Sequence, residues 1–251
     1  GTGKGNLKIS LAGRKTEFWI DDEKWAVKLG PFSYGGPYTA VINLNEEKLQ
    51  IKNVMIGEVF LCAGQSNMQF TIGEEQPSRK YESDPMLRTY VAERIEAYEG
   101  IKSADGWVQS TTENICFWSA IGYHLARSVR KFTGAAVGIV GCWQGASIIQ
   151  SWIRKDIISR KEYFIPNEQM SFNEKHNEYK IYSAWNGFGM LHDRVFSKIA
   201  PYTFSNVIWY QGESNASIAE GKMYVKLLGA LISSWREELL DPELPFIVVQ
   251  I

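Results

Sequence analysis

The chain has 251 residues, a hydrophobic share of 45% and a formal net charge of -1, as expected for a folded globular protein. A charge so close to zero creates no overall field that would attract nucleic acid or an anionic membrane, so neither partner is expected. No apolar stretch of the sequence is long enough to cross a bilayer, and nothing in it indicates an oligomeric state.

The three cysteines, Cys62, Cys116 and Cys142, form no CxxC pair and have no spacing typical of a metal site. An odd and low number of cysteines argues against a disulfide scaffold. Cys62 and Cys142 lie in apolar, strand-like runs. We therefore predict that both are buried free thiols, and we expect no bound metal.

Residues 1–56 alternate apolar and polar side chains, which is typical of half-buried strands. The segment "YGGPYTAVI" opens a further strand after a glycine- and proline-rich turn. We therefore predict a small β-rich, sandwich-like domain over residues 1–56. The alternating residues are Leu7, Ile9 and Leu11, then Phe18 and Ile20, then Trp25, Val27 and Leu29.

The pattern changes after this segment, and continuous apolar runs alternate with helix-period segments. Such runs are typical of strands buried on both faces of a parallel sheet. Strands that alternate with helices predict an α/β domain, here over residues 57–251. The expected strands are 58–63, 136–141, 205–210 and 245–251.

Two helices are predicted from apolar stripes, over residues 117–132 and 218–238. The segments 72–115 and 154–186 are polar and rich in tyrosine, so we expect long loops or insertions beside the sheet there. The stripes consist of Ile121, Leu125, Val129 and Phe132 in the first helix, and of Tyr224, Leu227, Leu228, Leu231 and Trp235 in the second.

Three of the predicted strands end in glycines, amides and hydroxyls, at residues 64–67, 141–147 and 209–215. In an open parallel sheet, ligands bind beyond the carboxyl ends of the strands. Glycine lets the backbone approach a reacting atom, and a serine at a helix start lies among free N–H groups. For Ser66 alone, a helix cap is the plainer interpretation. Three such ends on one sheet favour a nucleophile beside an oxyanion hole instead.

The motifs "GEVFLCAGQSNM" and "VIWYQGESNA", in this order, resemble the carbohydrate esterases of the SGNH hydrolase superfamily, and in particular the sialate O-acetylesterase family. "FSYGGPYTAVI", "GIVGCWQGASIIQSW" and "LPFIVVQI" are similar to the same family, so the resemblance runs from about residue 25 to the end. Many members have Gly-Gly-Thr where this chain has Gln144-Gly145-Ala146. The resemblance implies a flavodoxin-like, three-layer α/β domain with a parallel sheet and no cofactor.

The resemblance also implies roles for single residues. Ser66 is expected to attack an acetyl ester on a sugar and to form an acyl-enzyme that water hydrolyses. The backbone N–H groups of Ser66 and Gly145 and the side chain of Gln211 are expected to form the oxyanion hole. Four further residues are expected to bind the substrate or to shape the loop: Gln65, Asn67, Glu213 and Asn215. An O-acetylated sugar is the expected partner, and a secreted or periplasmic location follows, although the chain contains no signal.

A catalytic serine needs a base, which this family supplies from a DxxH-type motif after the last strand. No such motif follows here, so we expect the chain to stop before that segment. We expect His124 to be a packed or half-exposed helix residue and His176 to lie in a surface loop. His192 has Asp193 beside it, but adjacent residues are not expected to place a carboxylate behind the imidazole.

Three functions stay open at this point. Sialic acid is the sugar that the resemblance favours, which implies a sialate 9-O-acetylesterase. An acetylxylan esterase uses the same chemistry, and sugar choice depends on the loops at 72–115 and 154–186. A non-catalytic carbohydrate-binding protein with an incomplete esterase site is the alternative of another class, and the absent DxxH motif supports it.

Overall fold

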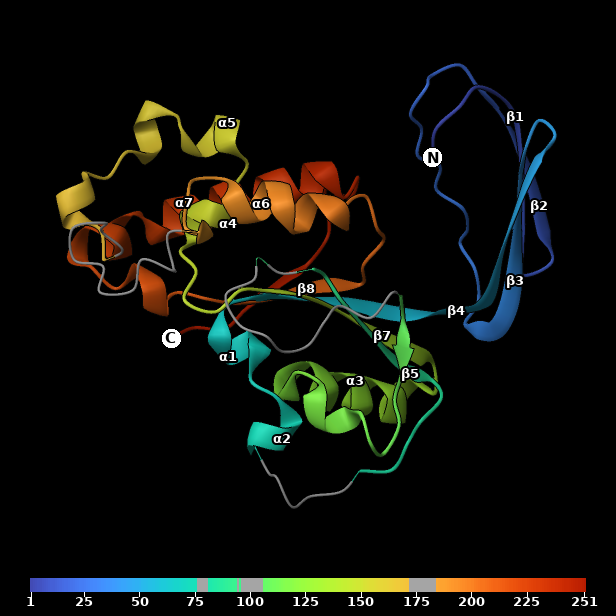
Figure 1. Cartoon of the computed structure of the whole chain (residues 1–251), viewed down its shortest axis with the longest axis horizontal. Helices are drawn as coiled ribbons and strands as arrows, with labels where there is room; N and C mark the ends of the chain where they lie inside the picture. Colours follow the sequence, from blue (N-terminus) through green and yellow to red (C-terminus); the bar gives the residue numbers. More distant parts are fainter. Residues whose placement is uncertain (76–80, 94, 96–105, 172–183) are drawn as a thin grey trace. The chain divides into compact units, whose positions relative to one another are not determined.

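The computed structural model describes residues 1–75, 81–93, 95, 106–171 and 184–251 (Figure 1). The chain forms two compact units. One unit consists of Gly1–Glu58 with Thr133–Ala136, and the other consists of Val59–Phe132 with Val137–Ile251. The predicted division between residues 56 and 57 stays a prediction, and the sequence did not indicate that 133–136 belongs to the first unit.

The first unit contains an antiparallel sheet in the order β2-β1-β3-β4, and β4 continues into the second unit. Leu7 and Ile9 of β1 are buried with Ile20 of β2. The strand predicted at 25–29 is wrong. Its apolar side chains pack against this core but its backbone forms no strand, because alternation indicates which side chains are buried and not which backbone finds a pairing partner. The strands are β1 Gly5–Leu11, β2 Arg14–Ile20, β3 Gly35–Leu44 and β4 Glu47–Gly64.

The sheet of the second unit confirms the predicted α/β class. Its strand order is β9-β8-β4-β7-β5-β6. β8 pairs in parallel with β4 and β9, β5 pairs in parallel with β7, and β6 is antiparallel to β5. The further strands are β5 Leu87–Val91, β6 Val108–Gln109, β7 Ala136–Trp143, β8 Asn206–Tyr210 and β9 Phe246–Val248.

Two details of the predicted sheet are wrong. β5 lies within 72–115, where loops were expected. The strand was not predicted because Arg88 and Thr89 interrupt its apolar run. β9 was expected to be buried on both faces, but Ile247 and Val248 are 50% and 41% exposed. Within the described part of the chain β9 pairs with β8 alone, so it is an edge strand.

The helix predicted over 218–238 is confirmed as α7, and a capping box between Ser217 and Glu220 closes its first turn. The helix predicted over 117–132 is α3, which begins three residues later. Its predicted stripe is partly wrong, because Phe132 is 92% exposed and Tyr123 is buried instead. The α-helices are α1 Ser66–Gln69, α2 Ile72–Glu75, α3 Ala120–Thr133, α4 Ile149–Trp152, α5 Lys155–Ile158, α6 Met190–Arg194 and α7 Ile218–Glu238. The 3-10 helices are η1 Ile115–Phe117, η2 Lys161–Tyr163, η3 Asn167–Gln169, η6 Phe196–Lys198 and η7 Glu213–Asn215.

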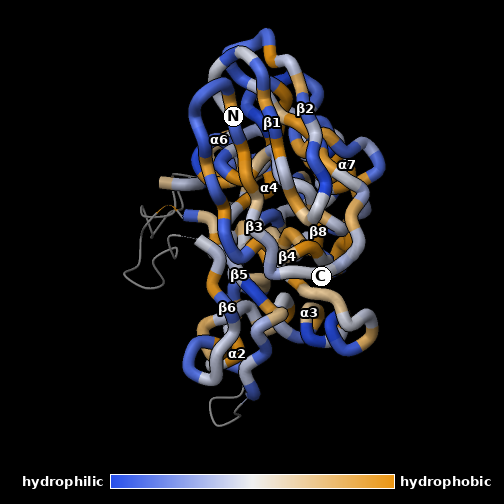
Figure 2. Tube along the Cα trace, turned by 90° about the vertical axis from the view of Figure 1, so that its right-hand side faces the viewer, coloured by the Kyte–Doolittle hydropathy of each residue, from blue (hydrophilic) through white to orange (hydrophobic). Residues whose placement is uncertain are grey.

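Helices cover both faces of the sheet in the second unit (Figure 1). Successive side chains of β4 point to opposite faces. Phe60 and Cys62 pack in a cluster with α3, whereas Leu61 and Ala63 pack in a cluster with α4, α6 and α7. Figure 2 shows the hydrophobic colour concentrated where β4 and β8 run. The second unit therefore has three layers, with the sheet between two layers of helices.

Cys62 and Cys142 are buried free thiols, as predicted, and Cys116 is a partly exposed one. Burial raises the pKa of Cys62 to about 12. Burial also raises the pKa of Cys142, because a thiolate would lose its hydration in the core. Among the helices of the described segments, none combines the length and the apolar character that crossing a membrane requires.

Candidate active site

The end of β4 presents Ser66 at the carboxyl edge of the sheet. Gly64 has φ +142°, and a Cβ on it would collide with the backbone oxygen of Tyr210 on the neighbouring strand β8. Only glycine fits both conditions. Gln65 is extended, and Ser66 begins the short helix α1 with an exposed side chain. The strand therefore delivers a serine hydroxyl to the surface immediately after a buried core segment.

The three predicted strand ends meet at this edge. Backbone hydrogen bonds of 3.1 Å join Gln65 N–H to Tyr210 O and Gln144 N–H to Gly64 O. A Cβ placed on Gly145 would lie 3.9 Å from the Cβ of Ser66. The loop after β7 therefore passes directly beside the serine, and a glycine at position 145 keeps the space between them open.

The backbone N–H groups of Ser66 and Gly145 are available as donors. Within the described ranges, neither group donates to another residue. Ser66 is the first residue of α1, where an N–H has no partner inside the helix. These two groups are the donors that the resemblance implies for an oxyanion hole.

Gln65 and Asn67 both connect the serine to the segment after β8. Gln65 is 3% exposed, and its Oε1 accepts hydrogen bonds from the N–H groups of Gly212 and Ser214, each at 3.4 Å. The Nδ2 of Asn67 donates to the carboxylate of Glu213, which is exposed. Both contacts shape the loops on either side of Ser66.

The side chain of Gln211 is committed to buried partners. Its Nε2 donates to the backbone oxygen of Ser147 and to Oδ1 of Asn215, each at 2.8 Å, and its Oε1 accepts from the hydroxyl of Tyr224 at 2.7 Å. Both protons of Nε2 are thus used, and Gln211 is 2% exposed. This arrangement leaves no proton for an oxyanion, so we assign Gln211 to the support of the loop after β7. Asn215 is 4% exposed and belongs to the same buried network.

Two residues of the site were missed by sequence reasoning. Asn186 holds the loop after β7 with two hydrogen bonds: its Oδ1 accepts from Ile148 N–H at 2.9 Å and its Nδ2 donates to Ala146 O at 2.8 Å. Glu220 is fully buried and accepts from Asn215. Asn186 lies in a segment read as a loop, and no motif marked it. The capping-box spacing from Ser217 to Glu220 was visible in the sequence, but it indicates a helix start and not a link to the site.

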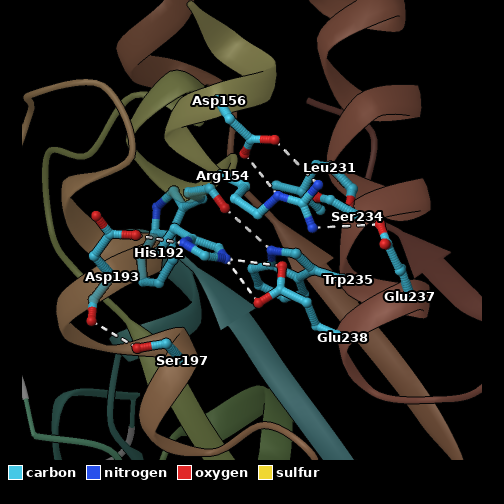
Figure 3. A network of polar contacts seen from close by, with 11 residues as sticks. Arg154, Asp156, His192, Asp193, Ser197, Leu231, Ser234, Trp235, Glu237 and Glu238 are labelled. Atoms are coloured by element: carbon cyan, nitrogen blue, oxygen red, sulfur yellow. Dashed lines mark hydrogen bonds and ion pairs between the residues drawn. The ribbon is translucent and has the colours of Figure 1, made fainter.

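His192 lies between two carboxylates, which corrects the expectation that adjacent residues would not pair (Figure 3). Asp193 Oδ1 lies 2.7 Å from Nδ1, and Glu238 Oε1 lies 2.9 Å from Nε2. The side-chain conformation of Asp193, which sequence spacing does not specify, permits this contact. Burial alone would lower the pKa of His192, but the hydrogen bonds to Glu238 and Asp193 outweigh it and raise the pKa. Because both ring nitrogens are occupied, His192 links α6 to α7 and is not a base for Ser66.

The other two histidines supply no base in the described structure either. His124 is a half-exposed residue of α3, as predicted, and its Nε2 lies 2.8 Å from Oε2 of Glu75. His176 lies outside the described residues. Within those residues, the Oγ of Ser66 has no hydrogen-bond partner. The candidate catalytic groups among the described residues are therefore the hydroxyl of Ser66 and the backbone N–H groups of Ser66 and Gly145.

Comparison with known proteins gives matches over most of the chain. A profile of the family described as "Carbohydrate esterase, sialic acid-specific acetylesterase" matches residues 56–251. Sialate O-acetylesterases of Homo sapiens and Rattus norvegicus are 27% and 25% identical over 236 and 254 residues, which cover 86% and 85% of this chain. The chain spans 43% and 46% of the lengths of these relatives.

A solved structure is similar over the whole chain. It is described as a novel carbohydrate acetylesterase from Xanthomonas citri, with a TM-score of 0.78 and 25% sequence identity, covering 100% of this chain and 55% of that one. The family profile covers far more than half of the present sequence. The chain therefore belongs to the carbohydrate esterase family of sialic acid-specific acetylesterases.

Proposed function

We propose that the chain carries the nucleophile and the oxyanion hole of a serine esterase that removes O-acetyl groups from sugars. Ser66 Oγ attacks the carbonyl carbon of the acetyl ester, the sugar hydroxyl leaves, and water then releases acetate from the acyl-enzyme. Family membership and the exposed serine at the end of β4 support this proposal. The lack of another partner for the backbone N–H groups of Ser66 and Gly145 among the described residues also supports it, whereas no described histidine is free to act as the base.

The observation that carries the proposal is the close approach of Gly145 to Ser66. A Cβ on Gly145 would lie 3.9 Å from Ser66 Cβ, so the backbone of the two residues borders one small space. The tetrahedral intermediate places negative charge on the former carbonyl oxygen. Two backbone N–H groups at that space would stabilise this charge, and loss of one such donor typically costs about 100- to 1,000-fold in kcat.

We further propose that the base comes from a part of the protein that the structure does not describe. His192 has both ring nitrogens occupied by carboxylates, and His124 is paired with Glu75. A serine beside an oxyanion hole without its base retains about 1,000- to 10,000-fold catalysis over water in related triads. The present residues alone would therefore give weak turnover.

The names of the relatives indicate O-acetyl esters of sialic acid as the substrate. The curated relatives are named sialate O-acetylesterases, and the matching family is described as sialic acid-specific. We propose the 9-O-acetyl ester as the position attacked. The secreted or periplasmic location stays a prediction, and fractionation of cells that express the protein with its native flanking sequence would test it.

An acetylxylan esterase is the second candidate, and Glu213 favours it. This exposed carboxylate is tied to Asn67, the residue next to the nucleophile. A negative charge there repels the carboxylate of a sialic acid but does not affect a neutral xylose unit. Release of acetate from 9-O-acetylated sialic acid and from acetylated xylan, measured side by side, would separate the two substrates.

Labelling by a fluorophosphonate probe tests the catalytic role of Ser66. The wild type for this test is the protein with its native flanking sequence, so that the base is present. We expect one label per chain in this wild type and in Ser233→Ala, a control at an exposed serine of α7, and none in Ser66→Ala. Acetate release should follow the same order. Absence of both labelling and acetate release in the wild type would refute the esterase. Sugar binding in that case, measured by calorimetry, would favour the non-catalytic carbohydrate-binding protein.

A further inference from the structure

A buried polar network beside the loop after β7 has the side-chain amide of Asn215 at its centre. The Oδ1 of Asn215 accepts from the backbone N–H of Ile149 at 2.9 Å and from Nε2 of Gln211 at 2.8 Å. Its Nδ2 donates to Oε1 of Gln150 at 2.8 Å and to Oε1 of Glu220 at 3.1 Å. All four hydrogen-bonding positions of the amide are therefore used.

Glu220, in the first turn of α7, is 0% exposed. Its Oε2 accepts from the backbone N–H groups of Ser171 and Ser217, at 2.8 and 3.3 Å. Its partners among the described residues are N–H groups, and they include no lysine or arginine. Burial of a carboxylate without a cation is costly. A capping carboxylate on the surface would avoid this cost. Capping of α7 therefore does not explain why the carboxylate of Glu220 is buried against Asn215.

The carboxylate determines which way round the Asn215 amide lies. The N–H of Ile149 can only donate, and the carboxylate of Glu220 accepts, and the two groups contact different ends of the amide. A half turn of the amide would place Nδ2 against the N–H and Oδ1 against the carboxylate. Both new contacts would be repulsive, so Glu220 holds Oδ1 towards the loop after β7.

That loop is the one that carries Gly145. Asn215 holds it at Ile149, and Gln211, which Asn215 also orients, holds it at the backbone oxygen of Ser147 at 2.8 Å. Asn186 holds the same loop at Ala146 and Ile148. The position of Gly145 opposite Ser66 therefore depends on a chain of contacts that begins at Glu220.

We propose that Glu220 and Asn215 are positioning residues, which fix the backbone N–H of Gly145 at the distance from Ser66 that the oxyanion requires. The inference rests on the proposed esterase function and deepens it. Neither residue touches the substrate. Both act through the loop after β7, and a change in either displaces a donor that matters in the transition state more than in the bound substrate.

The variant Glu220→Gln tests this role. The amide introduced at position 220 has one accepting end and one donating end. If its oxygen accepts from Nδ2 of Asn215, its NH2 group faces the N–H groups of Ser171 and Ser217, which is repulsive. If its oxygen accepts from those N–H groups instead, its NH2 group faces Nδ2 of Asn215 and favours the reversed orientation of the Asn215 amide. Ser217→Ala is the matched control. It removes the cap hydrogen bond of 3.1 Å to the Glu220 N–H, at the same helix start, and leaves the carboxylate on Asn215. We expect this control to lower Tm by roughly 2–4 °C with unchanged kcat.

The readouts are kcat and KM for p-nitrophenyl acetate and the inhibition constant of methylboronic acid, which becomes a tetrahedral anion when Ser66 Oγ adds to boron. We expect Glu220→Gln to lower kcat and boronate affinity by about 10- to 100-fold with KM nearly unchanged. Glu220→Asp keeps the charge at the helix start but shortens its reach to Asn215. This variant should fold and show a smaller loss in both quantities.

The outcomes separate this inference from the proposed function. Unchanged kcat and boronate affinity in folded Glu220→Gln and Glu220→Asp, with an active wild type, would overturn the positioning role and leave the esterase in place. Equal losses in Ser217→Ala would also overturn it, because they would indicate a general effect of the helix start. A wild type without turnover and without label on Ser66 would overturn both.

Discussion

The backbone oxygen of Tyr210 occupies the space that a side chain on Gly64 would need. Gly64 also has φ +142°, which other residues rarely adopt. We expect Gly64→Ala to lower the free energy of unfolding by roughly 2–4 kcal/mol, because the added methyl group must separate β4 from β8 or strain the turn. Urea denaturation followed by circular dichroism measures this change.

Gly229→Ala is the control for that variant. Gly229 lies in α7, and a Cβ there meets nothing within 4 Å. Alanine should raise the free energy of unfolding by about 0.5–1 kcal/mol. A Gly64→Ala protein as stable as the wild type, with Ser66 labelled at the same rate, would contradict the role of Gly64 in presenting the nucleophile.

His192 gives the stability of the protein a predictable pH dependence. Its pKa in the folded state is raised by Glu238 and Asp193 against the opposing effect of burial, with Arg154 paired to Asp156 and Glu237 nearby (Figure 3). A raised pKa means that the contribution of the imidazolium is fully present below about pH 6.5, the value in the unfolded chain. The contribution is lost as the pH rises through the folded-state pKa.

We therefore expect wild-type stability to fall between pH 6 and pH 9 more steeply than that of His192→Gln. The variant should also lose about 1–2 kcal/mol at pH 6, because it leaves the partly buried carboxylate of Glu238 without its charged partner. Urea titrations across this pH range measure both effects. Parallel curves for the two proteins would show that folding does not raise the pKa of His192.

The three cysteines should differ sharply in reactivity. Burial raises the pKa of Cys62 to about 12 and raises that of Cys142, whereas Cys116 is partly exposed. The thiolate is the reactive form. Iodoacetamide followed by mass spectrometry should modify Cys116 alone in the native protein and all three residues in guanidinium. Rapid native modification of Cys62 would contradict the packing described for β4.

The charge of Glu213 should influence which sugar ester the site accepts. Glu213→Gln keeps an acceptor for Asn67 and removes the negative charge beside the nucleophile. We expect kcat/KM for an anionic O-acetylsialate to rise about twofold relative to a neutral acetylated sugar. The difference should shrink in 0.5 M salt, because the charge is exposed. An equal effect on both sugars would show that Glu213 acts on geometry and not through charge.

The sequence predicted those elements whose spacing of apolar residues matches the face that they bury in the structure. The helix over 218–238 has a long stripe that meets the sheet at Leu227, Leu231 and Trp235, and its bounds were correct. β5 was missed because its side chains mix apolar and polar types. The segment at 25–29 was misread because its side chains pack although its backbone does not pair.

The candidate site was predictable to the level of strand ends and not to the level of single contacts. Gly64 and Ser66 follow a buried strand, so a serine at the sheet edge could be predicted. The partners of Gln211 and Asn215 could not, because a polar side chain near a site fits an oxyanion and a buried loop equally well. Only the positions of Ser147 and Glu220 in space decide between these roles.

Successive side chains of β4 point to opposite faces of the sheet, so the number of residues in the strand determines which layer of helices each side chain contacts. Deleting one residue between Phe60 and Ala63 would send the side chains meant for the α3 layer into the layer of α4, α6 and α7, and the reverse. Deleting or inserting two residues would restore the assignment. Redesign of this chain can therefore change the length of β4 before Ser66 only by an even number of residues.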